Sequence, residues 1–211
     1  MTKSAQTLQI ESEQETTRGI ILRAATRQFA DHGFTGTSLR DIGEEADINF
    51  QSIRYHFGSK EDLWEAVVAN LTREALQAGI HHEQATASLP PADQLKAQVR
   101  ALVAHQVANP DLMRVLIREA MKNSDRYRRI YPLYIAPFYE LAEKFLKRMQ
   151  KAKVVNPDIP IKILVMVFRG ALNFRLIVPA ENELYTKRPL NSEASITEHA
   201  DAITQLLLAK N

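Results

Sequence analysis

Side chains that can hydrogen-bond to nucleic-acid bases gather in one short segment, Asn49–Arg54. Its expected outer face carries two amides, a hydroxyl and a guanidinium, a combination that suits the donor and acceptor pattern of the DNA major groove. A helix this short buries too little apolar surface to exist for stability alone. We therefore predict that the segment reads bases, with contacts from Asn49, Gln51, Ser52 and Arg54.

A second polar cluster lies where this short helix meets the following one. A helix N-terminus offers free amide groups, and a lysine beside it can hold a backbone phosphate. Tyr55, His56 and Lys60 are placed for such contacts. Two alternatives stay open. His56 can instead be buried and structural, and Phe50 can touch a thymine methyl group or the sugar backbone, or be an ordinary exposed aromatic residue.

Capping signals divide the first part of the chain into short helices. Apolar residues recur at helical spacing from about Thr16 to His32, and Gly33 follows where a left-handed residue ends a helix. Ser38 and Asp41 have the spacing of a capping box for a second helix, expected to end near Ala46. Two helices thus precede the base-reading segment.

The base-reading segment is itself bounded by turn and cap residues. A tight turn at Asp47-Ile48 leads into it, Asn49 can cap it, and Gly58 stops it. Ser59 can then cap a long fourth helix. Three short helices followed by a long one, within so few residues, suit a compact DNA-reading module.

With these residues in place, the segment Thr37–Leu63 resembles the DNA-binding domain of the TetR family. The likeness extends over about Thr16–Leu71 and is most specific over Ile53–Leu63, where Tyr-His-Phe precedes Ser-Lys-Glu-x-Leu. The resemblance implies that some residues approach bases or the nearby backbone, namely Arg40, Gln51, Ser52 and Arg54. It implies that others contact phosphates or support such contacts, namely Tyr55, His56 and Lys60.

Three residues depart from the family pattern. Arg54 stands where Tyr is usual, which adds a charged contact and alters sequence preference. Asp47 stands where Gly is common; Asp tolerates the turn but brings negative charge near DNA. Gly43 replaces a common Ala at a cost of about 1 kcal/mol in helix propensity, which suggests a close approach between helices.

Composition and resemblance together imply an all-α fold. Seven Gly and nine Pro in 211 residues leave little room for a loop-rich β architecture. We expect a flexible tail over 1–15, a three-helix helix-turn-helix DNA-binding domain over 16–62, and a helical ligand-binding and dimerisation domain over 63–211. Past His82 a loop should run to Pro90-Pro91. Further helices are expected at roughly Ala92–Ala108, Pro110–Met121, Ser124–Lys151, Pro160–Ile177 and Ser195–Ala209, the third kinked or divided by Pro132 and Pro137.

Polar and aromatic residues of the second half are candidates for a small-molecule site. Four aromatic residues between Tyr127 and Phe138 share one helical stripe, for which core packing is the ordinary explanation and a cavity wall the alternative. His105, and Arg118 beside Glu119, stand on apolar helices, where they are either structural or ligand anchors. The expected ligand contacts are His105, Arg118, Tyr127, Tyr131, Tyr134, Phe138, Arg169 and Asn173.

The last two helices are too apolar to stand alone. Phe168, Ala171, Leu172, Phe174 and Arg175 on one, with Ile203, Leu206 and Leu207 on the other, suggest a surface shared by two subunits. In the resembled family, partner subunits form a four-helix bundle from these helices. We therefore expect a C2 homodimer.

Bulk properties exclude several functions. A formal net charge of +2 does not by itself indicate nucleic-acid binding, and the absence of Cys removes thiolate metal sites. No secretory signal is expected, and charges within Ile161–Val178 argue against a membrane helix, so a cytoplasmic protein is expected. We find no Ser-His-Asp triad, phosphate-binding loop or acid/base pair in the sequence, and therefore predict neither an enzyme nor a cofactor. No metal site is predicted either, because His81-His82-Glu83 has no second group of ligands to pair with.

The expected function is a ligand-responsive repressor. Its homodimer would bind a palindromic double-stranded operator, with recognition helices about 34 Å apart, and a small apolar or aromatic effector would release it. The embedded arginines would tolerate an anionic group on that effector. The alternative is a DNA-binding protein without an effector, whose second half serves only dimerisation or a protein partner; a core without voids would favour it.

Overall fold

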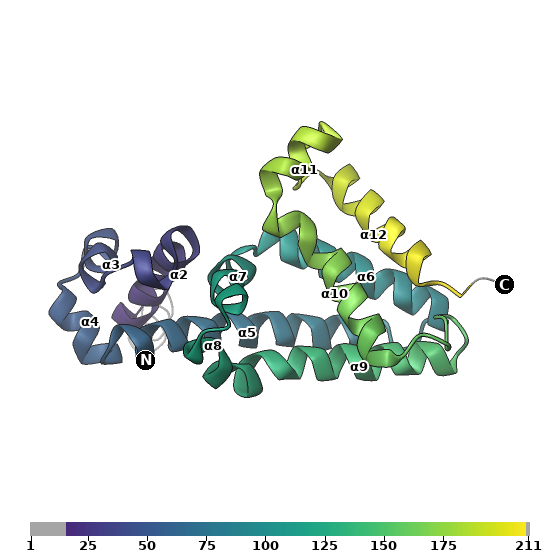
Figure 1. The fold of residues 1–211 in the computed structure, drawn as a ribbon, viewed down its shortest axis with the longest axis horizontal. Coiled ribbons are helices and arrows are strands. Elements are labelled where there is room, and N and C mark those ends of the chain that lie inside the picture. Colours follow the sequence, from purple (N-terminus) through teal and green to yellow (C-terminus); the bar gives the residue numbers. More distant parts are fainter. Residues whose placement is uncertain (1–15, 210–211) are drawn as a thin grey trace, which may run out of the picture. The chain divides into compact units, whose positions relative to one another are not determined.

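The structure, a computed structural model, describes residues 16–209, and the tail expected over 1–15 lies outside them. In this range all named elements are helical and no β-strand is present, apart from one isolated bridge between Val155 and Leu208. The expectation of an all-α fold is confirmed. The chain divides into two compact units, one up to Val68 and one from Ala69 (Figure 1).

The first unit begins with α2 (Thr17–Gly36), which Thr16 caps by accepting a hydrogen bond from the Gly19 amide. Gly33 interrupts the helix with φ +72°, a left-handed conformation that suits glycine. The predicted end at His32 is therefore a break, beyond which helical turns continue to Gly36. The Thr37 hydroxyl closes the segment by donating to the carbonyls of Gln28 and Gly33.

Two short helices follow, α3 (Leu39–Ala46) and α4 (Phe50–Phe57). The predicted capping box is present: Asp41 accepts from the Ser38 amide at 2.8 Å, and the Ser38 hydroxyl accepts from the Asp41 amide at 3.2 Å. Asp47 adopts the left-handed conformation at φ +53° between the two helices. The expected turn is thus made without glycine at its left-handed position.

The core of the first unit is aromatic and aliphatic. Phe29 and Phe34 stack with ring centroids 6.1 Å apart, and Trp64 meets Phe34 edge-on at 6.3 Å. Ile42 from α3 and Ile53 from α4 are fully buried. Trp64 lies on α5 (Lys60–Ala85) and is a core residue, as expected from the sequence.

The second unit contains the rest of α5 and the remaining helices. These are α6 (Pro91–Ala108), α7 (Asp111–Lys122), α8 (Asp125–Ile130), the π-helix η1 (Tyr131–Ile135), α9 (Ala136–Lys151), α10 (Ile161–Ile177), α11 (Pro179–Thr186) and α12 (Glu193–Leu207). The predicted division of the third helix by two prolines is confirmed as a π-helical insertion. The helix α11 was not predicted; Pro179 starts it at a position where a missing amide hydrogen costs nothing.

Four helices, α6, α9, α10 and α12, enclose the core of the second unit. In Figure 1, α12 lies along α6, and α9 runs beside the later part of α5, to which Arg148 and Glu83 link it by an ion pair of 2.7 Å. No helix within residues 16–209 has the length and apolar character needed to cross a membrane.

The core corrects part of the expected subunit surface. The buried residues include four assigned from the sequence to subunit contact: Phe168, Leu172, Ile203 and Leu207. The error arose because a strongly apolar helix does not reveal which side faces its own core. Arg175 is also internal, since it donates to the Asn182 side chain and to Ser195.

Gly43 is required by a close backbone approach. The turn after α3 brings the Ile48 amide onto the Gly43 carbonyl at 2.9 Å, and a Cβ at position 43 would lie 2.6 Å from the Ile48 carbonyl oxygen. Gly43→Ala should gain about 1 kcal/mol of helix propensity but lose more through overpacking, typically about 1–3 kcal/mol. We expect a net decrease in the unfolding free energy of the first unit, measured by chemical denaturation.

The matched control for this prediction is Gly79→Ala. Its added Cβ would make an ordinary contact of 3.8 Å with Leu141, so the propensity gain should dominate. Equal effects of the two substitutions on unfolding would contradict the assigned role of Gly43.

Candidate functional site

The helix α4 presents a polar face that its inner residue and its caps hold in place. Asn49 accepts a hydrogen bond from the Gln51 amide at 2.9 Å, and Gly58 ends the helix at φ +83°. Ile53 is buried in the core of the first unit, whereas Gln51 and Arg54 are exposed. The outer face therefore carries hydrogen-bonding groups whose positions are set by the packing of the opposite face.

The end of α4 carries two exposed rings. The Tyr55 side chain is 87% exposed, and the His56 ring meets it edge-on with centroids 5.3 Å apart. Exposure of His56 argues against the alternative of a buried structural histidine. A phenol and an imidazole placed in this way can both donate hydrogen bonds to phosphate oxygens.

Phe50 connects the start of α4 to α3. It is half-buried, and the Arg40 guanidinium carbon lies 5.7 Å from its ring centroid. Ser52 is also half-buried, whereas Arg40 is exposed. A cation over an aromatic face is stabilised while its N–H donors remain available. Phe50 therefore supports Arg40, in addition to any contact of its own.

Lys60 has an internal role that the sequence did not reveal. Its ammonium group donates to the carbonyl of Phe34 at 3.0 Å and to that of Thr37 at 2.9 Å, and lies 4.3 Å from the Phe34 ring centroid. Two donors and the charge of the group are thus used to join the start of α5 to the end of α2. Of the two roles that the resemblance implies for Lys60, these contacts favour support of the surface.

Acidic residues of the first unit are also used internally. Backbone and side-chain hydrogen bonds from Ser38 lower the pKa of Asp41 below its usual value, so its carboxylate is kept for the capping box. Glu45 accepts hydrogen bonds from Arg27 and Gln28. These contacts explain how a domain with nearly balanced charges can still offer polar and cationic groups on α4.

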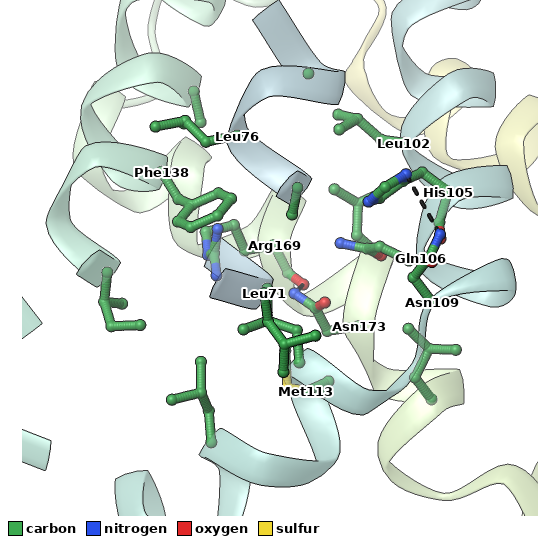
Figure 2. A pocket seen from close by; sticks show the side chains of 18 of the residues that line it. Leu71, Leu76, Leu102, His105, Gln106, Asn109, Met113, Phe138, Arg169 and Asn173 are labelled. Atoms are coloured by element: carbon green, nitrogen blue, oxygen red, sulfur yellow. Dashed lines mark hydrogen bonds between the residues drawn. The ribbon is translucent and has the colours of Figure 1, made fainter. Parts of the chain in front are cut away.

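The second unit contains a cavity of about 520 Å³. Its walls come from α5, α6, α7, the α8–α9 segment including η1, and α10, and most lining side chains are apolar. Figure 2 shows polar groups on two walls: His105 and Gln106 on α6 with Asn109 at its C-cap, and Arg169 and Asn173 on α10. A mainly apolar cavity of this size with a few polar groups is typical of small-molecule sites.

Five of the eight expected ligand residues line this cavity, and three do not. The five are His105, Tyr127, Phe138, Arg169 and Asn173. Tyr131 and Tyr134 are excluded because the π-helical turn changes the helical register, which places Ile135 and Tyr139 in the lining instead. The prediction of one aromatic stripe from Tyr127 to Phe138 had assumed an uninterrupted α-helix.

Arg118 lies on the exposed side of α7, outside the cavity lining. Its expected partner Glu119 is buried and instead accepts hydrogen bonds from Ser124 and Arg126, both at 2.6 Å. The buried acid therefore joins α7 to α8. Adjacent residues on a helix point in different directions, which accounts for the burial of Glu119 and the exposure of Arg118.

Gln106 and Asn109 were not predicted as cavity residues, although their spacing in the sequence indicates one helix face. Leu102, His105, Gln106 and Asn109 have i, i+3, i+4, i+7 spacing, which is one face of a helix. The His105 ring lies 3.5 Å from the Asn109 amide nitrogen. Burial lowers the pKa of His105, and the nearby His82 lowers it further, so the neutral imidazole is favoured in this wall.

Two family models match the chain. One, described as bacterial regulatory proteins of the tetR family, matches residues 21–67. The other, described as a tetracyclin repressor-like C-terminal domain, matches residues 91–207. Together they include the surface of α4 and most of the cavity walls.

Relatives of known name agree with these matches. The HTH-type transcriptional repressor SCO4008 of Streptomyces coelicolor is 27% identical over 173 residues, spanning 78% of this chain and 81% of that protein. The HTH-type transcriptional repressor NicS of Pseudomonas putida is 35% identical over 109 residues, and the alignment spans about half of each chain (50% and 49%).

Solved structures show the same fold. HlyIIR, a hemolysin II transcriptional regulator, has a TM-score of 0.70 at 22% identity, covering 92% of this chain and 98% of that one. KstR2 of Mycobacterium tuberculosis, a ketosteroid transcriptional regulator, has a TM-score of 0.69 at 17% identity, covering 94% and 98%.

The internal role of Lys60 predicts a stability effect. Lys60→Met should remove both hydrogen bonds to carbonyls and lower the unfolding free energy of the first unit by about 1–3 kcal/mol. Arg54→Met, on the exposed face of α4, should change stability by no more than about 0.5 kcal/mol. Thermal or chemical unfolding of both variants measures this difference. A Lys60→Met protein as stable as the parent would indicate that the ammonium acts on DNA instead.

Proposed function

The chain belongs to the TetR family of bacterial transcriptional regulators, and from this premise we propose that it is a repressor that binds a palindromic operator as a homodimer and leaves it when a small molecule enters the cavity. The observation that carries this proposal is the polar face of α4. Gln51 and Arg54 of this face are exposed and Ser52 is half-buried, while Ile53 and the caps at Asn49 and Gly58 fix the helix. Such a helix is suited to enter the major groove.

The proposed DNA contacts divide into two groups. Gln51, Ser52 and Arg54 face outward on α4 and are suited to base edges, with Arg40 supported on the Phe50 ring. Tyr55 and His56 are suited to phosphates, whereas Asn49 and Lys60 mainly hold the surface in shape. Phosphate contacts should supply affinity, and base contacts should supply sequence choice.

The proposed dimer surface is the exposed face of α10. Its positions alternate in steps of four and three residues, the spacing that lets two helices pack side by side. The four large side chains are between 40% and 61% exposed, which leaves an apolar stripe on the isolated subunit. Leu206 on α12 is also exposed. The stripe consists of Ile163, Val167, Gly170, Phe174 and Ile177.

The cavity supports control by a ligand. A regulator without an effector has no need of a large void, because unfilled space in a core is destabilising. Leu71, Glu74 and Gly79 of α5 line the cavity, and the same helix begins at Lys60 in the DNA-binding unit. A ligand that moves α5 would change the operator affinity, and a coupling of about 1–3 kcal/mol suffices for a 5- to 150-fold effect.

Repression is supported by the relatives, since SCO4008 and NicS are both described as repressors. A protein acting on operators of the bacterial chromosome would work in the cytoplasm.

The test of operator binding starts from fragmented genomic DNA of the source organism, captured by the purified protein at moderate salt and sequenced. We expect one or a few fragments sharing a palindrome. Tyr55→Ala should weaken binding to all fragments, whereas Gln51→Ala should mainly relax sequence choice, with a loss of about 1–3 kcal/mol in discrimination at one position of each half-site. Scattered, salt-labile capture, or equal sequence-blind losses in both variants, would count against this reading.

The test of the dimer surface is Val167→Glu. A carboxylate in the centre of the stripe would have to be buried without a partner, so the variant should be monomeric at concentrations where the parent is a dimer. Lys162→Glu, which changes an exposed neighbour outside the stripe, serves as the control. Sedimentation analysis measures the mass, and circular dichroism checks the fold. A Val167→Glu protein that remains dimeric would refute this interface.

A further inference from the structure

One cationic group stands out in the cavity of the second unit. The Arg169 guanidinium lies on α10 in a wall that also contains Tyr127, Phe138 and Tyr139. Its central carbon is 4.4 Å from the centroid of the Tyr139 ring. Figure 2 shows Arg169 beside Phe138 and near Asn173. The guanidinium is a cation with five N–H donors and no acceptor.

Arg169 has no carboxylate partner within salt-bridge distance among residues 16–209. The three acidic residues of the cavity lining are engaged elsewhere. Glu74 accepts from Asn70, Glu83 pairs with Arg148, and Asp111 pairs with Arg114. A partly buried cation without a counter-ion costs free energy, and the ring of Tyr139 offsets only part of that cost.

Other polar atoms of the cavity wall also lack partners within the described chain. The side-chain oxygens of Gln98 and Gln106, both on α6, are buried and accept no hydrogen bond. Buried polar groups are normally paired. Both atoms are acceptors, so a ligand would satisfy them only with a donor group, and the case for an anionic group rests on the cation on α10.

We propose that the effector is an organic anion, a carboxylate on an apolar body, whose charged group binds the guanidinium of Arg169. This inference rests on the proposed function and names the ligand class of its cavity. The carboxylate would accept parallel hydrogen bonds from the fork of guanidinium N–H groups, a geometry that arginine provides and lysine does not. The body would fill the apolar walls formed by residues such as Leu71, Leu102 and Met113.

The charge of Arg169 selects against other ligand groups at the α10 wall. A cation would be repelled by Arg169, and a neutral molecule would leave the guanidinium without a counter-ion. Asn173 fixes the α10 wall, since its amide nitrogen donates to the Arg169 carbonyl at 2.7 Å. The polar part of the effector is therefore expected at the α10 wall.

The experiment compares six probes on two apolar bodies by titration calorimetry. They are naphthylacetate, naphthylacetamide and naphthylethylammonium, and decanoate, decanamide and decylammonium. At least one carboxylate should bind the full-length protein about tenfold more tightly than its amide, because a hydrogen bond to a charged group adds about 1.5–3 kcal/mol. Equal or tighter binding of the amide or the ammonium compound, or no binding of either carboxylate, overturns the proposal.

Variants assign the preference to one side chain. Arg169→Met should bring carboxylate affinity down to that of the amide, and Arg169→Lys should retain part of the preference. Arg118→Met, which removes an arginine outside the cavity, should bind like the parent protein. A loss of preference in Arg118→Met, or its retention in Arg169→Met, overturns the proposal.

Stability of the ligand-free protein separates a binding role from a structural one. If Arg169 serves to bind an anion, its charge does not stabilise the ligand-free fold. Arg169→Met should then leave the melting temperature unchanged or raise it. A decrease of several degrees would show that the guanidinium serves the fold, and would overturn the proposal.

DNA capture distinguishes failure of this inference from failure of the proposed function. Arg169→Met should still bind the operator fragment, while decanoate or naphthylacetate no longer releases it. If the protein captures no specific DNA, the proposed function fails, but the calorimetric preference still decides the ligand class. If capture succeeds and neutral probes release the DNA as well as carboxylates do, only the ligand class is wrong.

Discussion

An eight-residue helix does not hold its shape in water without help, and the proposed contact surface of this protein is such a helix. The residues around α4 supply the stability that such a short helix lacks. Asn49 satisfies an amide at its start, Gly58 ends it, and Ile53 anchors its inner face. The close turn at Gly43 and the left-handed Asp47 then set the angle between α3 and α4. The polar residues outside are free for recognition because none of them is needed for this support.

The two units use buried or half-buried cations in opposite ways. Lys60 is satisfied by the carbonyls of Phe34 and Thr37, so its charge contributes to the fold of the first unit. Arg169 lines a cavity, where its guanidinium lies over the Tyr139 ring and has no carboxylate partner within residues 16–209. The difference separates a structural cation from one suited to a ligand, and the sequence alone could not show it, because both residues lie on helices beside aromatic side chains.

Local signals were enough to predict most of the first unit. The capping box at Ser38, the cap at Asn49 and the stop at Gly58 each depend on residues a few positions apart. The second unit depended on contacts that are distant in sequence. The π-helical turn moved Tyr131 and Tyr134 out of the cavity wall, and the buried Glu119 pairs with Arg126 of the next helix. Periodicity also identified α10 as strongly apolar without telling its buried face from its exposed face.

The faces of α10 are hard to tell apart from the sequence because the helix borders three environments: the core, the cavity and the exposed surface. Leu164 and Phe168 pack into the core, Arg169 and Asn173 line the cavity, and Val167 belongs to the exposed stripe. A helix with so few free faces cannot adjust to a ligand on one side without disturbing its packing on another, because protein interiors are close-packed. If two subunits join through the stripe, an anion drawn to Arg169 acts on the same helix that holds the partner. The cavity and the dimer surface would then respond to the ligand together.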